Sequence, residues 1–463
     1  MNKKKILFGK KIAITAHNIE KKEHRGIAVF VKSIIKLLNK NGAEIYLITS
    51  TKSNRLKKIN KKSKKYNQIY LKEMYSSMTK GVEFREDFKS SNNYKLKLII
   101  KLLINLVFLC KNNFIFRYEI FYQQNSKLIK KIDPRLDYLK DIKGFIWIKK
   151  IFHISRLRSM RLLIKDPELN LEKNKIDLII STSPLSLKFK NSGNAEIVQF
   201  IHDAIPLCVS NPVENRRTFY NKLLDAHNHC KCVYVSKESK RVVSKILNIN
   251  NADNLIINPL PSLNKDDLKR AYNIENIKNI DRQFILLNSS IVETKRVEKA
   301  IYYFLKSNLT KRNFLFCIAG KLHNSSYCDY IKYLCKGHDN ILLLDYVDEL
   351  EKAWLFLNSS LLISTTKIEG FGIPVLDGLS IGLPTLATSI PSHHEIKAIK
   401  KNNFIKLINQ EDERTWIDLL NKLNIFEINN LKLRYKRLNF FKHFIKEYEE
   451  KTLDKFVKIL EQK

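Results

Sequence analysis

Glycine is scarce in this chain of 463 residues, yet four of its twelve glycines fall within one segment, residues 369–382. The segment reads Glu-Gly-Phe-Gly-Ile-Pro-Val-Leu-Asp-Gly-Leu-Ser-Ile-Gly. Glycine is favoured where the backbone turns sharply or comes close to a ligand. The run Ser-Leu-Leu-Ile-Ser-Thr at 360–365 is typical of a buried strand, and Pro374 is typical of the first turn of a helix. The pattern therefore predicts a strand, a glycine loop and a helix.

Two carboxylates bracket the predicted loop, Glu369 at the strand end and Asp377 one helical turn in. The start of a helix presents free N–H groups and the positive end of the helix dipole, which bind phosphates and hydroxyls. An ordinary tight turn would also use glycines, but it would not require acids in this register. The segment is therefore a candidate site for a phosphate or a sugar.

With Pro374, Gly382 and Pro384 in register, the segment resembles the signature E-G-F-G-x-P-x-x-E-A-x-x-x-G-x-P of the family 4 (group 1) glycosyltransferases. The resemblance implies a retaining enzyme with two Rossmann-like, doubly wound α/β domains facing a cleft, the glycosyltransferase B fold. It implies that Glu369 holds the hexose of a nucleotide-sugar donor and Asp377 its ribose, although Asp377 is one methylene shorter than the family glutamate. The rest of the implied donor-binding loop is Gly370, Phe371, Gly372 and Ile373.

A second loop follows the predicted strand 284–288, which opens the second domain. It begins with Ser289 and carries the basic pair Lys295 and Arg296. The resemblance implies that this loop binds the donor and that the pair contacts the diphosphate. Charged hydrogen bonds there stabilise the negative charge that develops in the transition state. An exposed basic loop in a lysine-rich protein is the alternative interpretation.

Acceptor-side candidates lie in the first half of the chain. A strand at 196–201 ends in His202 and Asp203, which resemble the family's His-Asp element near the donor sugar. A structural histidine and a helix-capping aspartate are the alternatives. Placement at the carboxyl end of a strand favours a functional role. The resemblance thus implies a catalytic role for His202, as for Lys295, Arg296 and Glu369.

The N-terminal βαβ unit is predicted from a strand at 11–16, a helix at 27–39 and a strand at 44–49. Its first loop ends in Arg25 and Gly26. In the resembling family this loop lies against the acceptor and the donor phosphate, which implies an acceptor-side role for Arg25 and a donor-side role for Gly26. A simple turn explains these two residues equally well.

The domain boundaries follow from composition and from the order of predicted elements. The polar stretch after Asn258-Pro-Leu-Pro261 predicts a linker, and the final helix is expected to return to the first domain. The predicted parts are 1–262 (acceptor domain, with a basic helical insertion at 51–165), 263–283 (linker), 284–428 (nucleotide-sugar domain) and 429–463 (C-terminal helix).

The formal net charge is +38, and it is concentrated in the N-terminal half. Residues 51–150 hold 25 Lys and Arg against 8 Asp and Glu, whereas residues 351–400 hold 4 of each. Codon bias toward lysine supplies such charge, but it does not concentrate it. We expect residues 51–160 to contact an anionic membrane surface, with the segment 96–110 either an interfacial helix or a core helix. Nucleic acid is not an expected partner, because base-stacking aromatics do not interleave with the basic run.

Other sequence patterns indicate where the protein is located and which cofactors it needs. Residues 1–11 lack the apolar core of a secretory signal, the longest apolar stretch is too short to span a bilayer, and the seven cysteines are scattered. These features predict a cytoplasmic protein, peripheral at the inner face of the cytoplasmic membrane. The sequence shows neither a D-x-D motif nor a C-x-x-C pair, so we expect no metal and no cofactor beyond the nucleotide-sugar co-substrate.

The implied activity is transfer of a hexose to a glycan or lipid-linked acceptor with retention of configuration, in bacterial surface polysaccharide or lipopolysaccharide synthesis. Two alternatives stay open: a nucleotide-sugar epimerase of the same fold, and a non-catalytic glycan-binding relative. An epimerase would release no free nucleotide when acceptor is added. A binding protein that had lost transfer would be expected to lose the acids, of which only Asp377 departs from the family pattern.

Overall fold

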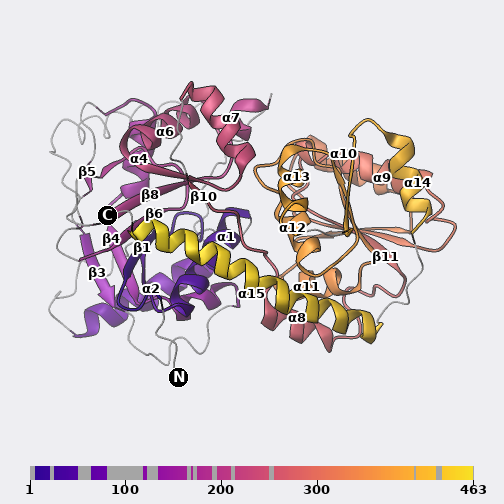
Figure 1. Ribbon diagram of the computed structural model, residues 1–463, viewed down its shortest axis with the longest axis horizontal. Helices are drawn as coiled ribbons and strands as arrows, with labels where there is room; N and C mark the ends of the chain where they lie inside the picture. The colour runs from indigo at the N-terminus through magenta and orange to yellow at the C-terminus, as the bar shows by residue number, and fades with distance from the viewer. Residues whose placement is uncertain are drawn as a thin grey trace, which may run out of the picture. The chain divides into compact units, whose positions relative to one another are not determined.

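The computed structural model divides the chain into two compact units (Figure 1). Unit 1 comprises residues 1–234, 244–255 and 453–463, and unit 2 comprises residues 235–243 and 256–452. The structure describes residues 6–20, 26–50, 64–80, 118–122, 134–163, 168–169, 171, 175–189, 195–209, 214–249, 255–400, 403–423 and 430–461.

Unit 1 is built on an eight-stranded sheet with the order β10-β9-β8-β6-β1-β2-β4-β3. Neighbouring strands from β9 to β4 are parallel, whereas β3 runs antiparallel to β4. The strands are β1 (Lys11–Thr15), β2 (Glu44–Thr49), β3 (Tyr118–Tyr122), β4 (Gly144–Ile148), β6 (Leu178–Ser181), β8 (Glu196–Ile201), β9 (Lys231–Tyr234) and β10 (Leu255–Ile256), with β5 (Glu168–Leu169) and β7 (Lys188–Phe189) forming a separate pair.

The helices from α1 to α7 follow the strands of this sheet in the chain. They are α1 (Gly26–Lys40), α2 (Lys64–Lys80), η3 (Pro134–Asp141), α4 (Ile151–Ser159), α5 (Ile205–Cys208), α6 (Arg216–His229) and α7 (Lys237–Leu247). Helix α1 buries the apolar face predicted by its period, including Phe30, Ile34 and Leu38, against the sheet. The predicted βαβ unit is confirmed, and each predicted end of its two strands and its helix lies within one residue of the observed end.

The described parts of the predicted insertion, residues 51–165, contain helices and also two strands. Strand β4 pairs with β2 in the main sheet, with Tyr46 opposite Gly144. A side chain at Gly144 would place its Cβ 2.3 Å from the carbonyl oxygen of Phe121 in β3, so only glycine allows the two strands this approach. This stretch therefore completes the sheet of unit 1.

Unit 2 contains a six-stranded parallel sheet with the order β13-β12-β11-β14-β15-β16. Counted from β11, this is the doubly wound order 3-2-1-4-5-6. The strands are β11 (Phe284–Asn288), β12 (Leu315–Ala319), β13 (Ile341–Asp345), β14 (Leu361–Ser364), β15 (Thr385–Thr388) and β16 (Ile405–Ile408). The helices are α8 (Lys265–Tyr272), η5 (Glu293–Lys295), α9 (Val297–Lys306), α10 (Ser326–Cys335), α11 (Glu349–Asn358), α12 (Ile373–Ser380), α13 (Pro391–Lys397), α14 (Glu413–Asn421) and α15 (Leu431–Glu461).

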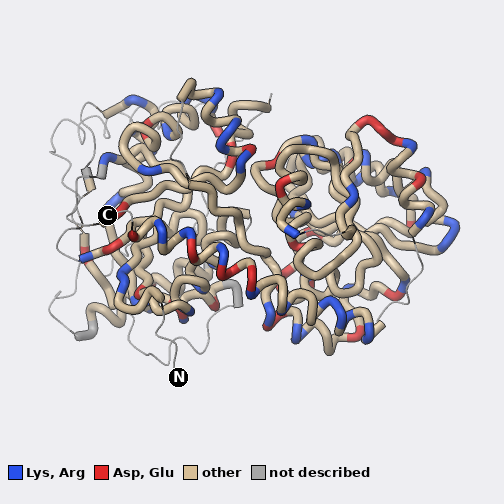
Figure 2. Tube along the Cα trace, in the orientation of Figure 1, with Lys and Arg blue, Asp and Glu red and all other residues tan. Residues whose placement is uncertain are grey.

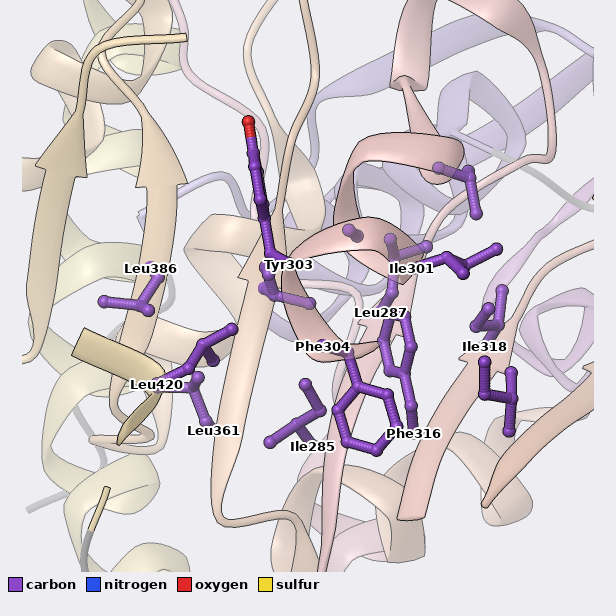
Figure 3. Close-up of a cluster of buried hydrophobic side chains, with 14 of the residues drawn as sticks. Ile285, Leu287, Ile301, Tyr303, Phe304, Phe316, Ile318, Leu361, Leu386 and Leu420 are labelled. Atoms are coloured by element: carbon purple, nitrogen blue, oxygen red, sulfur yellow. The ribbon is translucent and has the colours of Figure 1, made fainter. Parts of the chain in front are cut away.

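Both faces of the second sheet are buried, as expected of a parallel sheet covered by helices. On one face Ile285 and Leu287 pack against α9, α10 and α14, a cluster drawn in Figure 3. On the other face Phe284 and Leu286 pack against α8, α11 and α15. Alternate residues of β11 are thus buried in the clusters on opposite faces of the sheet. This explains why nearly every residue of the strand is apolar.

The described residues contain only part of the predicted basic insertion. In the described parts, Lys and Arg occur in both units together with Asp and Glu (Figure 2), although α1 and α4 contain basic residues and no acidic residue. The lysine run beginning at Lys57 and the expected helix at 96–110 lie outside the described residues, apart from Lys64 and Lys65 at the start of α2. Among the helices described, none combines the length and the apolar character needed to cross a membrane.

Candidate functional site

The glycine loop and helix α12 form as the sequence predicts. Gly372 has φ 104° and directly precedes Ile373, and Pro374 lies in the first turn of the helix. A Cβ at Gly372 would lie 3.0 Å from Cδ2 and 3.1 Å from Nε2 of His393, so both the backbone and the neighbouring ring require glycine. The hydroxyls of Ser236 and Ser239 donate to the carbonyl of Gly370, at 2.5 and 3.0 Å.

Glu369 forms an ion pair with Lys295 at the carboxyl edge of the second sheet. Glu369 follows β14, whereas Lys295 ends the short helix η5 in the loop after β11. Both side chains are 15% exposed. This edge of a doubly wound sheet is where such folds bind ligands. The pair therefore offers one cation and one carboxylate to a ligand that carries both negative charge and hydroxyls.

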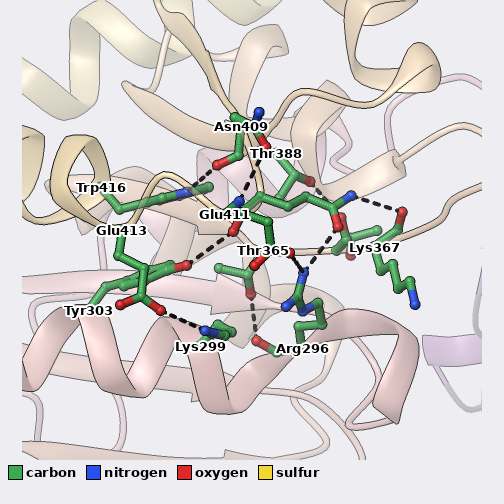
Figure 4. Close-up of polar contacts among 12 residues, drawn as sticks. Arg296, Lys299, Tyr303, Thr365, Lys367, Thr388, Asn409, Glu411, Glu413 and Trp416 are labelled. Carbon is green, nitrogen blue, oxygen red and sulfur yellow. Dashed lines mark hydrogen bonds and ion pairs between the residues drawn. The ribbon is translucent and has the colours of Figure 1, made fainter.

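The side chain of Arg296 is directed elsewhere. Its Nη1 donates to Oε1 of Gln410 at 3.0 Å and lies 3.2 Å from Oε1 of Glu411, both in the loop after β16 (Figure 4). Arg296 has φ 49°, in the left-handed region, and its side chain contacts partners different from those of Lys295. The structure thus does not bring the predicted basic pair together around one point. The diphosphate role of Arg296 remains a prediction.

Hydrogen bonds between loops hold the backbone of this basic segment. Oγ1 of Thr365 donates to the carbonyls of Lys295 and Arg296, at 3.1 and 2.9 Å (Figure 4). Nε2 of Gln410 donates to the carbonyl of Lys367 at 3.2 Å. A small pocket lies among these loops and is lined by Arg296, Lys299, Tyr303, Thr365, Thr388, Gln410 and Trp416. The loops after β11, β14 and β16 are therefore tied into one edge.

Asp377 is buried in α12, and its carboxylate has partners within unit 2. Its Oδ1 accepts from the backbone N–H groups of Ser262 and Leu263, at 2.6 and 3.3 Å, and its Oδ2 accepts from the Ser262 hydroxyl. Burial raises the pKa of Asp377 to about 6, against the opposing effects of Lys352 and of these hydrogen bonds. The ribose contact of Asp377 remains a prediction.

The raised pKa of Asp377 predicts a dependence of stability on pH. The folded state binds the proton more tightly than the unfolded state, so the stability contributed by this carboxyl is full below pH 3.8 and is lost as the pH rises through about 6. We expect Asp377→Asn, which cannot ionise, to gain stability relative to the wild type between about pH 4 and pH 7. Melting temperatures of the two proteins across this range measure the difference.

The matched control for this measurement is Asp281→Asn, because the Asp281 side chain is 77% exposed. Its melting temperature should follow the wild type at every pH. A constant difference between Asp377→Asn and the wild type across the range would show that Asp377 titrates normally in the folded protein.

The acceptor-side residues lie in unit 1. His202 follows β8, and its Nε2 lies 2.8 Å from the carbonyl oxygen of Thr182, while its ring meets Phe30 edge-on at 5.4 Å. Burial lowers the pKa of His202 to about 4, which makes the ring neutral at neutral pH. Oδ1 of Asp203 accepts from the N–H of Ile205 at 2.9 Å, as a residue preceding a helix does.

The remaining predicted site residues are Gly26, Arg25 and Ser289. Gly26 begins α1 with φ 21°, whereas Arg25 lies outside the described residues. Ser289 directly follows β11, and its N–H donates to the carbonyl of Ala319 in β12 at 3.0 Å. Within the described residues, His, Cys, Asp and Glu side chains do not gather in any group of three or more that could hold a metal ion. The expectation of a metal-independent protein stays a prediction.

Residues 261–434 match the family model described as "Glycosyl transferases group 1". The matched segment contains Lys295, Glu369, Asp377 and the glycine loop between the two acids. Over this segment, which is less than half of the chain, the protein is therefore similar to the group 1 glycosyl transferases. No curated protein sequence matches the chain.

Solved structures match the whole chain at low identity. TarM from S. aureus is 13% identical, with 98% of this chain and 99% of that chain covered and a TM-score of 0.54. Sucrose-phosphate synthase from Thermosynechococcus elongatus is 10% identical (98% and 100% covered, TM-score 0.55), and WaaG is 12% identical (96% and 98% covered, TM-score 0.51). The chain therefore has the glycosyltransferase B fold with two Rossmann-like α/β domains, and the predicted fold class is confirmed.

Proposed function

We propose that this chain is a retaining glycosyltransferase, which moves a hexose from a nucleotide-sugar donor to a glycan or lipid-linked acceptor. The observation that carries the proposal is the Lys295–Glu369 pair beside the start of α12, inside the segment that matches group 1 glycosyl transferases. Helix N–H groups and an ammonium group suit a diphosphate, and a carboxylate suits sugar hydroxyls. Groups at one sheet edge thus fit two parts of such a donor, the diphosphate and the sugar.

The proposed chemistry needs no nucleophile from the chain. Lys295 and the α12 N-terminus stabilise the negative charge that grows on the leaving diphosphate, while Glu369 holds the hexose through its hydroxyls. The leaving diphosphate itself takes the proton of the acceptor hydroxyl on the same face of the sugar, which preserves the anomeric configuration. His202, neutral at neutral pH, is proposed to contact the donor sugar from the acceptor side. Arg25 and Asp203 are proposed to line the acceptor side with it.

Related folds support the substrate class and the pathway. A TarM structure holds UDP and α-GlcNAc-glycerol, and WaaG is described as a glycosyltransferase involved in lipopolysaccharide biosynthesis. We infer that this chain acts in bacterial surface polysaccharide synthesis, in the cytoplasm, without a metal ion. A nucleotide-sugar epimerase of the same fold is the second candidate, since it would use the same donor contacts.

Donor binding tests this proposal directly. We would heat the protein with UDP-glucose, UDP-N-acetylglucosamine, GDP-mannose or ADP-glucose at millimolar concentration. A bound donor raises the melting temperature by mass action, and about 2.7 kcal/mol of stabilisation is expected at 100 times the dissociation constant. Stabilisation by at least one donor supports the proposal, and Lys295→Ala should abolish it. Indifference to all four, with normal folding, would count against a nucleotide-sugar enzyme.

We further propose that residues 51–160 bind the anionic face of the cytoplasmic membrane, where a lipid-linked acceptor would be extended. Each Lys or Arg near such a surface contributes about 1 kcal/mol, so several together hold a protein at the membrane. In sedimentation with liposomes, we expect binding to require anionic lipid and to weaken in high salt. Binding should fall when Lys57, Lys58, Lys61, Lys62, Lys64 and Lys65 are changed to glutamine.

A matched control removes the same charge from exposed lysines of unit 2. These are Lys269, Lys306, Lys311, Lys336, Lys397 and Lys406. Equal loss of binding in both variants would mean that net charge alone is responsible. Binding to RNA with the same salt dependence, and none to anionic vesicles, would assign the charge to another partner.

A further inference from the structure

His393 of α13 is buried beside the glycine loop, and its hydrogen bond fixes its tautomer. Its Nδ1 lies 2.8 Å from the carbonyl oxygen of Thr388. A carbonyl only accepts hydrogen bonds, so Nδ1 must carry the proton. Burial lowers the pKa of His393 to about 4, and the ring is therefore neutral at neutral pH. The other nitrogen, Nε2, consequently presents a lone pair and acts as an acceptor.

Among the residues that the structure describes, none forms a hydrogen bond with Nε2 of His393. Buried polar atoms in folded proteins nearly always have one, so an orphan acceptor requires an explanation. The ring faces Gly372, where a Cβ would lie 3.1 Å from Nε2. The charges of Glu369 and Lys295 both act on the ring. The orphan nitrogen thus lies at the glycine loop, close to the ion pair of the proposed donor site.

Because Nε2 is an acceptor, its partner must be a hydrogen-bond donor. Phosphate oxygens are acceptors at neutral pH, so they cannot satisfy a bare acceptor nitrogen. A hydroxyl group can donate to it. Building on the proposed function, we propose that His393 Nε2 accepts a hydrogen bond from a hydroxyl of the donor sugar and so helps to determine which sugar is used. Because Gly372 packs on the ring, entry of the sugar requires a small outward shift of the 370–372 loop.

The variant His393→Asn tests this role while keeping the contact with Thr388. An asparagine amide nitrogen takes the place of Nδ1, whereas the acceptor at Nε2 is lost. The matched control is His394→Asn, because His394 is the adjacent histidine and is exposed. Isothermal titration would use the nucleotide sugar that stabilises the wild type most, together with its free nucleoside diphosphate. That pair separates sugar contacts from phosphate contacts.

We expect His393→Asn to weaken binding of the nucleotide sugar by roughly 3- to 10-fold, the effect of one neutral hydrogen bond, and to leave binding of the free diphosphate unchanged. His394→Asn should change neither. A second variant, His393→Gln, places an amide oxygen near the Nε2 position and should restore part of the affinity. In the wild type, a donor that lacks the contacted hydroxyl should lose the same affinity, and this loss should disappear in His393→Asn.

Equal weakening of sugar nucleotide and free diphosphate would overturn the inference, because it would show that His393 only supports the loop. Unchanged affinity for both would overturn it as well. If the wild type binds the free diphosphate but none of the nucleotide sugars, the proposed function fails first. A wild type in which every single-hydroxyl deletion is tolerated would contradict the inference without any variant.

Discussion

Glu369→Ala is expected to lower the turnover number by roughly 10²-fold or more while leaving the fold intact. The carboxylate lies at the carboxyl edge of the sheet and is paired only with Lys295 among the described contacts, so its removal leaves the core of unit 2 untouched. If Glu369 holds the hexose through the transition state, its loss reduces kcat and kcat/KM together. Steady-state rates of sugar transfer measure this.

Two further variants define the role of Glu369. Glu369→Gln keeps a hydrogen-bond acceptor but loses the charge opposite Lys295, and its rate should lie between those of the alanine variant and the wild type. The control is Glu411→Ala, because Glu411 is 72% exposed and contacts Arg296 instead. Its rate should stay within about twofold of the wild type, because the Lys295–Glu369 pair does not involve Glu411. Near wild-type transfer by Glu369→Ala would remove Glu369 from the donor site.

Arg437→Met is expected to lower the free energy of unfolding by about 1–3 kcal/mol, the usual cost of leaving buried acceptors without a donor. Arg437 of α15 is buried, and its Nη1 donates to the carbonyls of Phe356, Leu357 and Ser359, at 3.1, 2.8 and 2.8 Å. These carbonyls lie at the end of α11, where intrahelical donors run out. The guanidinium of α15 thus caps the C-terminal end of α11.

Thermal unfolding measures the effect of Arg437→Met. The control is Arg414→Met, because the Arg414 side chain is 93% exposed, and its stability should stay within about 0.5 kcal/mol of the wild type. Arg437→Lys keeps the charge but loses the planar donors, and an intermediate loss is expected. A wild-type melting temperature for Arg437→Met would mean that water satisfies the α11 carbonyls equally well.

The parts of the fold that local pattern governs were predictable from the sequence. Strand β11 was predicted with its observed ends, Phe284 and Asn288, because an apolar run bounded by polar residues defines a buried strand. Strand β4 was not predicted, since its run of Gly144 to Ile148 becomes a strand only by pairing with β2. Pairing of this kind depends on contacts about a hundred residues apart, which composition does not reveal.

The same limit applies to the candidate site. The glycine loop and its two acids were predicted because they form one short, continuous sequence pattern. The directions of the Lys295 and Arg296 side chains were not predicted, because they depend on partners 74 and 114 positions away, Glu369 and Gln410. The burial of His393 against the glycine loop was not predicted either, because it depends on packing against Gly372, twenty-one positions before it.

The central claim is that the chain transfers a sugar from a nucleotide donor, and one assay tests it most directly. The purified protein is incubated with a donor labelled in the sugar, with and without candidate glycan or lipid-linked acceptors. We predict that label moves to the acceptor, and that nucleoside diphosphate is released in equal amount and only when acceptor is present. Conversion of the donor to an isomer without release of diphosphate, or binding of acceptor glycans with no turnover of any donor, would contradict the account.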